Sequence, residues 1–157
     1  MNKNSKKIII SVLIVIFIGL ITFNINQSYK LKIYKEDLSI MFSKNLENFS
    51  SECMNLYDNE SYLRAYGYIT NARTALLGLS DRKGIPSDEA KYSLPLILLD
   101  LELLMMNDKE GAKKYLANEN VARTMHNISL DSNDKKSISE LVRVLDEYEI
   151  LRSYNCQ

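Results

Sequence analysis

The sequence predicts an all-α fold, with one N-terminal transmembrane helix followed by a small bundle of about four to five antiparallel helices. An uncharged apolar stretch runs from Ile8 to Ile25. Beyond it, apolar residues recur three and four positions apart, which is the period of an amphipathic helix. The 157 residues include only two prolines and five glycines, too few for the many tight turns of an all-β domain.

The apolar stretch has the length and flanks of a membrane anchor. As a helix, its 18 residues would span about 27 Å, near the hydrocarbon thickness of a bilayer, and flanking lysines can reach the headgroups. A cleaved signal peptide is the main alternative. However, no pair of small residues suited to cleavage follows Gly19, and the first cysteine, which a lipoprotein signal would need nearby, is Cys53. We therefore expect an uncleaved, single-pass signal anchor.

The charges around this stretch indicate an orientation. Lys3, Lys6 and Lys7 precede it together with the amino terminus, and the next lysines, Lys30 and Lys32, lie slightly farther from it. Because positive charge is retained on the cytoplasmic side, we expect residues 1–7 to be a short cytoplasmic basic tail. Residues 8–25 are then the anchor, and residues 26–157 form a helical bundle domain outside the membrane.

The first helix of that domain is predicted as a membrane-proximal stalk over about residues 28–57. Its apolar residues share one face: Leu31, Tyr34, Leu38, Phe42, Leu46, Phe49, Cys53 and Leu56. One interpretation buries this face within the chain's own bundle. The alternative is a coiled coil, in which the stalk pairs with a second copy near the membrane.

Clusters of capping residues mark the later helices. Residues 58–61 predict a helix over 61–79. Residues 80–87 are predicted to form a loop, and Ser87 or Asp88 would cap a third helix. The stretch 94–106 is apolar on nearly every side, which predicts a central buried helix. Shorter helices should begin after residues 107–108 and after residues 131–134, whereas the segment 118–128 is ambiguous.

The composition argues against several classes of function. All charged residues of the first 30 are lysines, so the rest of the chain holds 16 basic and 20 acidic side chains. This acidic balance does not suit nucleic-acid binding. His126 is the only histidine, the two cysteines are far apart, and no glycine-rich phosphate loop is found. We therefore expect no catalytic, metal or cofactor site, and no enzyme activity.

Three further features have a structural and a functional interpretation. Arg73 falls on the apolar face of its helix and Asp100 lies in the apolar stretch, so we predict a buried ion pair between them, which could instead line a polar ligand pocket. Cys53 and Cys156 could form a disulfide on the outer side of a membrane, or Cys53 could be a buried free thiol. Tyr68 points away from the apolar face and is the candidate for a partner surface.

The sequence is rich in Ile, Lys and Asn, a usage that suggests a bacterium with an AT-rich genome. Together these observations predict a non-enzymatic, membrane-anchored helical interaction module, facing outward from a bacterial cytoplasmic membrane. Its partners would be lipid, through residues 8–25, and another envelope protein or a second copy of itself. One alternative is a small-ligand sensor that signals through a partner. Another is an inward-facing adaptor of helical hairpins, similar to a tetratricopeptide repeat but without its signature residues.

Overall fold

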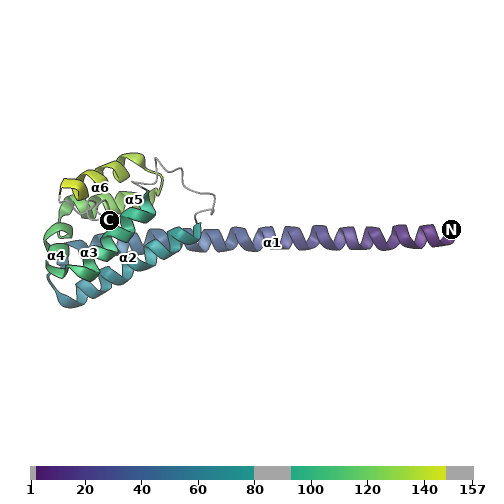
Figure 1. Ribbon diagram of the computed structural model, residues 1–157, viewed down its shortest axis with the longest axis horizontal. Helices are drawn as coiled ribbons and strands as arrows, with labels where there is room; N and C mark the ends of the chain where they lie inside the picture. The colour runs from purple at the N-terminus through teal and green to yellow at the C-terminus, as the bar shows by residue number, and fades with distance from the viewer. Residues whose placement is uncertain (1–2, 80–92, 148–157) are drawn as a thin grey trace, which may run out of the picture. The chain divides into compact units, whose positions relative to one another are not determined.

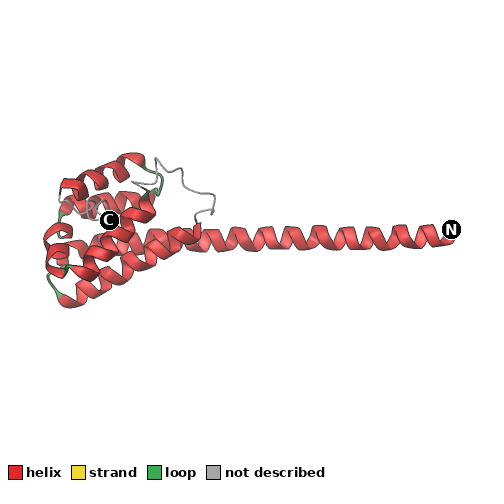
Figure 2. Ribbon diagram, viewed as in Figure 1, coloured by secondary structure: helices red, strands yellow, loops and turns green. Residues whose placement is uncertain are grey.

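The computed structural model describes residues 3–79 and 93–147, and all regular structure within these ranges is helical (Figures 1 and 2). The all-α prediction is therefore confirmed. The helices are α1 (Lys3–Glu52), α2 (Asn59–Leu79), α3 (Leu94–Asn107), α4 (Lys109–Leu116), α5 (Glu119–Leu130) and α6 (Lys135–Glu147), with a 3-10 turn η1 (Cys53–Asn55) between α1 and α2.

The chain divides into two compact units, Met1–Asp37 and Leu38–Gln157. The boundary falls inside α1, which is one helix from Lys3 to Glu52. The expected anchor and stalk are thus parts of a single element. This helix ends about five residues earlier than predicted, because the chain tightens into η1 after Glu52 and 3-10 turns commonly close a helix end.

In the second unit, α1 and α2 form an antiparallel hairpin. Glu52 on α1 meets Arg64 on α2 near the connection, and Leu38 packs on Gly78 toward the other end. A Cβ atom on Gly78 would lie 2.7 Å from Cδ1 of Leu38. Glycine at this position therefore allows the two helices to approach closely.

α5 runs antiparallel to α1 on another side of that helix. The Ser43 hydroxyl donates to the backbone oxygen of Ser129 at 2.6 Å, and the Ser50 hydroxyl donates to the backbone oxygen of Ala122 at 2.7 Å. The two serines are seven residues apart, so they lie on the same face of α1. Because serine side chains are short, these bonds allow the backbones of α1 and α5 to lie close together.

From Phe42 onward, the predicted apolar face of the stalk, which continues from α1 into η1 and the turn after it, is core. Phe42, Leu46, Phe49, Cys53 and Leu56 are buried. Leu38, the first residue of the second unit, is half-buried. In the first unit, Leu31 and Tyr34 are exposed.

α2 buries one face of mostly small side chains. Tyr62 and Ile69 are buried, whereas Leu77 is exposed. Three alanines complete the face: Ala65, Ala72 and Ala75. Small residues allow neighbouring helices to pack at short interaxial distances.

The predicted central buried helix over 94–106 is buried on one face only. One face packs inward through Ile97, Leu98, Leu101 and Met105, whereas Leu96 is exposed. α3 packs against α2 and α4. Its neighbours contact α3 mainly on one face, so some of its apolar side chains are not covered by the described part of the bundle.

The starts of α4 and α6 follow the predicted caps, whereas the cap of α5 was not predicted. The Asp108 side chain accepts from the backbone N–H of Gly111 at the start of α4, and Asn118 accepts from Asn120 at the start of α5. The segment 118–128, ambiguous in sequence, is therefore a capped helix. Asp134 caps α6, whereas the predicted loop 80–87 and the caps Ser87 and Asp88 lie outside the described residues.

Candidate functional site

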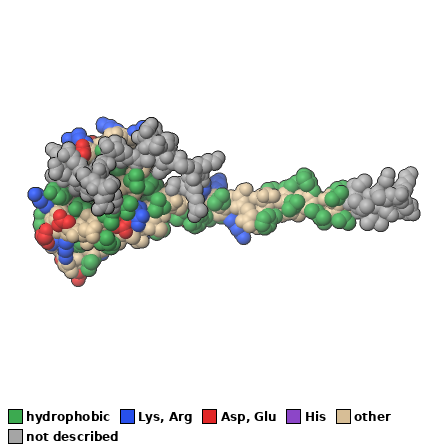
Figure 3. All heavy atoms as spheres, in the orientation of Figure 1, with side chains coloured by type: hydrophobic (Ala, Val, Ile, Leu, Met, Phe, Trp, Pro, Cys, Tyr) green, Lys and Arg blue, Asp and Glu red, His purple; other side chains and the backbone are tan. Residues whose placement is uncertain are grey.

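The first unit carries one N-terminal helix that is long and apolar enough to cross a membrane. Its large apolar side chains between residues 12 and 25 are all exposed, from 44% for Ile21 to 69% for Val15. Successive residues of a helix are 100° apart, so these side chains surround the axis. Over this stretch, the face of α1 drawn in Figure 3 shows hydrophobic side chains and no charged ones.

The polar side chains of this stretch bond to their own helix. The Thr22 hydroxyl donates to the backbone oxygen of Ile18, and the Asn24 amide donates to that of Leu20, each at 2.9 Å. These bonds satisfy the Thr22 hydroxyl donor and one of the two amide N–H donors of Asn24 without water, which is favourable for a helix in hydrocarbon. The segment therefore combines an apolar circumference with internally bonded polar groups.

Inside the second unit, the main polar contact joins α2 to α3. Nε of Arg73 donates to Oε2 of Glu102 at 2.5 Å, and the Thr70 hydroxyl donates to Oε1 at 3.0 Å. The side chains of Arg73 and Glu102 are only 24% and 12% exposed. The carboxylate therefore has a partner for each oxygen, and the pair links two helices where a buried charge alone would be unfavourable.

The predicted partner of Arg73 was thus misplaced by two residues. Among the described residues, Arg73 pairs with Glu102 and not with Asp100. Two residues on a helix are separated by about 200°, so these two acids lie on nearly opposite faces of α3. Asp100 is half-buried, and burial raises its pKa to about 6.

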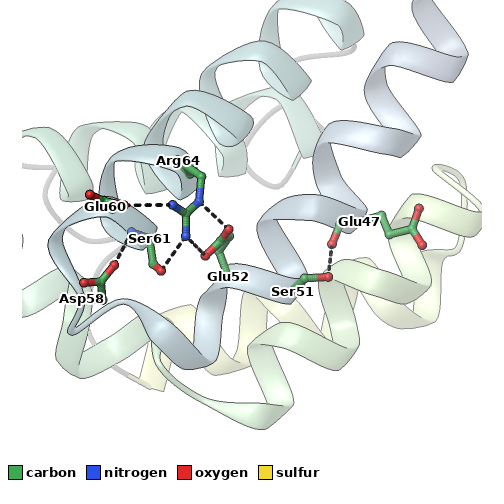
Figure 4. Close-up of polar contacts among 7 residues, drawn as sticks. All are labelled: Glu47, Ser51, Glu52, Asp58, Glu60, Ser61 and Arg64. Carbon is green, nitrogen blue, oxygen red and sulfur yellow. Dashed lines mark hydrogen bonds and ion pairs between the residues drawn. The ribbon is translucent and has the colours of Figure 1, made fainter.

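A second polar cluster, which the sequence did not reveal, closes the α1–α2 hairpin (Figure 4). Arg64 forms two hydrogen bonds to the Glu52 carboxylate, at 2.8 and 3.3 Å, and a third to the Ser61 hydroxyl at 2.9 Å. The Arg64 bonds hold the pKa of Glu52 below its usual value. Asp58 accepts from the backbone N–H of Ser61, and that bond lowers the pKa of Asp58.

This cluster is built from capping chemistry and a cross-helix ion pair. The run of capping residues at 58–61 was a recognisable sequence signal, whereas the pairing of Glu52 with Arg64 depends on the hairpin that brings them together. In Figure 4, Arg64 contacts Glu52, Glu60 and Ser61, and Asp58 accepts from the backbone N–H of Ser61. The ion pair between Glu52 and Arg64 therefore links α1 to α2 beside their connection.

Cys53 is fully buried and has no disulfide partner among the described residues, and burial raises the pKa of its thiol to about 12. A thiol in that state is a poor nucleophile, because reactivity belongs to the thiolate. Its predicted disulfide partner, Cys156, lies outside the described residues. The disulfide therefore remains a prediction.

The partner-surface residue proposed from sequence is not the most exposed tyrosine. Tyr68 is half-buried and packs against the core, whereas Tyr57 is exposed. The sequence placed Tyr68 on the solvent face of α2, opposite the apolar face, but part of this side chain packs against the core. Other large apolar side chains are exposed on the second unit: Ile40, Met41, Met54, Leu63, Leu77, Leu96, Met106 and Leu130.

Within residues 12–79 and 93–146, no group of three or more His, Cys, Asp or Glu side chains could hold a metal ion. His126 is exposed on α5. Comparisons of the chain with models of protein families, with curated proteins and with solved structures find no match. Its function is therefore inferred from its own residues.

Proposed function

We propose that this chain is a non-enzymatic helical interaction module, anchored by α1 in a bacterial cytoplasmic membrane. The observation that carries the proposal is the exposure of every large apolar side chain between residues 12 and 25. Burying that surface in lipid would release a large hydrophobic free energy, at roughly 25 cal/mol per Å². A core helix of a water-soluble protein would have its apolar residues covered, and here the apolar window is 0% buried.

The second unit supports the interaction part of the proposal. Its core is closed by residues of its own helices, yet it also exposes large apolar side chains on η1 and the turn that follows, at Met54 and Tyr57. Tyrosine and methionine are enriched in protein interfaces. We propose that this surface binds another envelope protein or a second copy of the chain.

Orientation can be tested with single cysteines. In a Cys156→Ser background, Asn4→Cys precedes the apolar stretch, and Asn127→Cys lies at an exposed position of α5. Buried Cys53 contributes little labelling. In intact cells, a membrane-impermeant maleimide should label Cys at 127 and not at 4. The reverse pattern would contradict the outward orientation and favour the inward-facing adaptor.

Partner binding can be tested with a photo-crosslinking amino acid placed at Tyr57 in the full chain. Native membranes should yield a discrete adduct, whose mass distinguishes a second copy from another protein. Lys135 is an exposed residue of α6 and provides the control position, which should give no adduct. Identical adduct patterns at both positions, or none at either, would contradict an interface at this surface.

A further inference from the structure

The segment of α1 that follows the apolar stretch combines an aromatic residue with two unpaired lysines. We name Tyr29, Lys30 and Lys32 the collar. All three side chains are exposed. Neither lysine forms an ion pair with another described residue. The collar lies wholly within the first unit, and Figure 3 shows basic side chains following the hydrophobic stretch on this helix.

The unbroken helix fixes the spacing of the collar from the apolar stretch. Lys7 and Lys30 both lie in α1, and the helical rise places them about 35 Å apart, slightly more than the hydrocarbon thickness of a bilayer. Lys6 and Lys32 are about 39 Å apart, close to the thickness that includes the headgroups. When Lys6 and Lys7 lie at one boundary of the membrane, the collar therefore lies at the other.

The chemistry of the collar suits lipid phosphates. Tyrosine is enriched at the level of the headgroups, and lysine ammonium groups there attract anionic lipids. Successive residues are 100° apart on a helix, so Lys30 and Lys32 lie on either side of Tyr29. The two ammonium groups can thus contact different lipid molecules around the helix.

A second copy of the chain suits this segment less well than lipid. A parallel coiled coil with Leu31 and Leu38 at positions a and Tyr34 at d would place Lys30 at g. Lys35 of the other helix would then lie opposite it at e, and like charges across that seam are repulsive. The lysines therefore oppose pairing of this segment and favour negatively charged headgroups.

We propose that the collar selects anionic phospholipids at one boundary of the membrane. This inference rests on the membrane anchor proposed above. The chain contains no tryptophan, so Tyr29→Trp introduces a single fluorophore at the collar, and tryptophan shares the interfacial preference of tyrosine. The full chain is reconstituted in two vesicle preparations. One contains brominated phosphatidylglycerol and the other contains the same mole fraction of brominated phosphatidylcholine. Bromine quenches only nearby tryptophan, so quenching reports which lipid lies next to the collar.

Brominated phosphatidylglycerol should quench Trp at 29 more strongly, corresponding to local enrichment of about five-fold for each lysine. Lys30→Gln with Lys32→Gln should equalise the two lipids. The matched control, Lys44→Gln with Lys135→Gln, removes two exposed lysines from the second unit and should leave the preference intact. Equal quenching by both lipids before any lysine is changed would overturn the selectivity alone. No quenching in vesicles made wholly of brominated phosphatidylcholine would overturn the anchor as well.

Discussion

At the scale of single residues, the contact between Arg73 and Glu102 shows how a buried charge is accommodated between helices. Glu102 lies on the same face of α3 as buried Leu98 and Met105, and this face meets α2. Asp100 lies off that face. The sequence alone could not distinguish the two acids, because the apolar residues surrounding them on all sides conceal which face of α3 is buried.

Replacing Arg73 with methionine should destabilise the protein, because the Glu102 carboxylate would remain in place with only the Thr70 hydrogen bond. Since the pair is not fully buried, we expect a loss of about 2 kcal/mol in the free energy of unfolding, below the cost for a fully buried pair. Denaturant unfolding of the full chain in detergent measures it. Adding Glu102→Gln should recover part of the loss, and an additive double variant would show that the two side chains are not coupled.

Asp100 should make the protein less stable as the pH rises, whereas a carboxylate in an ion pair makes it more stable. Burial raises its pKa from 3.8 to about 6 in the folded protein, so the folded state binds the proton more tightly than the unfolded state. Its contribution is therefore favourable at low pH and is lost as the pH rises through about 4 to 6. Asp100→Asn should stabilise the protein at pH 7 by about 1 kcal/mol, a value reduced for the remaining solvent exposure of the group.

The measurement compares the unfolding free energies of wild type and Asp100→Asn at pH 7 and pH 5. The stabilisation should shrink at pH 5, where Asp100 is largely protonated in the folded state. A benefit of equal size at both values would mean that charge at this position is not the cause.

At the scale of elements, the helices were predictable where caps and apolar periodicity agree. The start of α4 at Asp108 and that of α6 at Asp134 follow from side chains that accept backbone N–H groups. The boundary between α1 and η1 was less predictable, because no side-chain cap hydrogen bond marks the start of η1 at Glu52. Periodicity gives the buried face of a helix, but only packing partners decide how wide that face is.

Two glycines in helices should respond differently to alanine. A Cβ atom on Gly67 of α2 meets nothing within 4 Å, whereas one on Gly111 of α4 would lie 2.1 Å from Oδ2 of the capping Asp108. Gly67→Ala should therefore stabilise the protein by roughly 0.5–1 kcal/mol through helix propensity. Gly111→Ala should gain less or lose stability, because the cap must move and caps contribute about 1 kcal/mol.

Thermal unfolding of the two single variants gives the comparison directly. Both carry the same chemical change within a helix, so propensity alone predicts equal shifts. Equal stabilisation by both would mean that the Asp108 cap adjusts without loss. Asp108→Ala, which removes the cap, should reduce stability by about 1 kcal/mol and provides the reference value.

At the scale of the whole molecule, the sequence predicted the fold class and an apolar N-terminal helix, because both depend on local periodicity and composition. It did not predict where burial of α1 begins within the second unit, in which Leu38 is half-buried and Phe42 is buried. That depends on the contacts that α2 and α5 make with α1. The candidate contacts were least predictable, since Arg64 and Arg73 find partners 12 and 29 residues away in sequence.

The medium around α1 can be tested by comparing two equally exposed residues. Phe17 in the first unit is 65% exposed and Leu63 in the second is 61% exposed. If water surrounded both, lysine would be tolerated equally at each position. If lipid surrounds α1, Phe17→Lys places a charge near the centre of the span and disfavours insertion by about 3 kcal/mol.

We therefore expect Phe17→Lys to increase the fraction of protein released from membranes by alkaline carbonate, and Phe17→Lys with Val15→Lys to release most of it. Leu63→Lys should remain as membrane-bound as wild type. Circular dichroism of each variant in detergent should retain the helical signal, because residues 15 and 17 do not contribute to the buried core of the second unit. Release of the Leu63 and Phe17 variants to the same extent would show that α1 is not the element held by lipid.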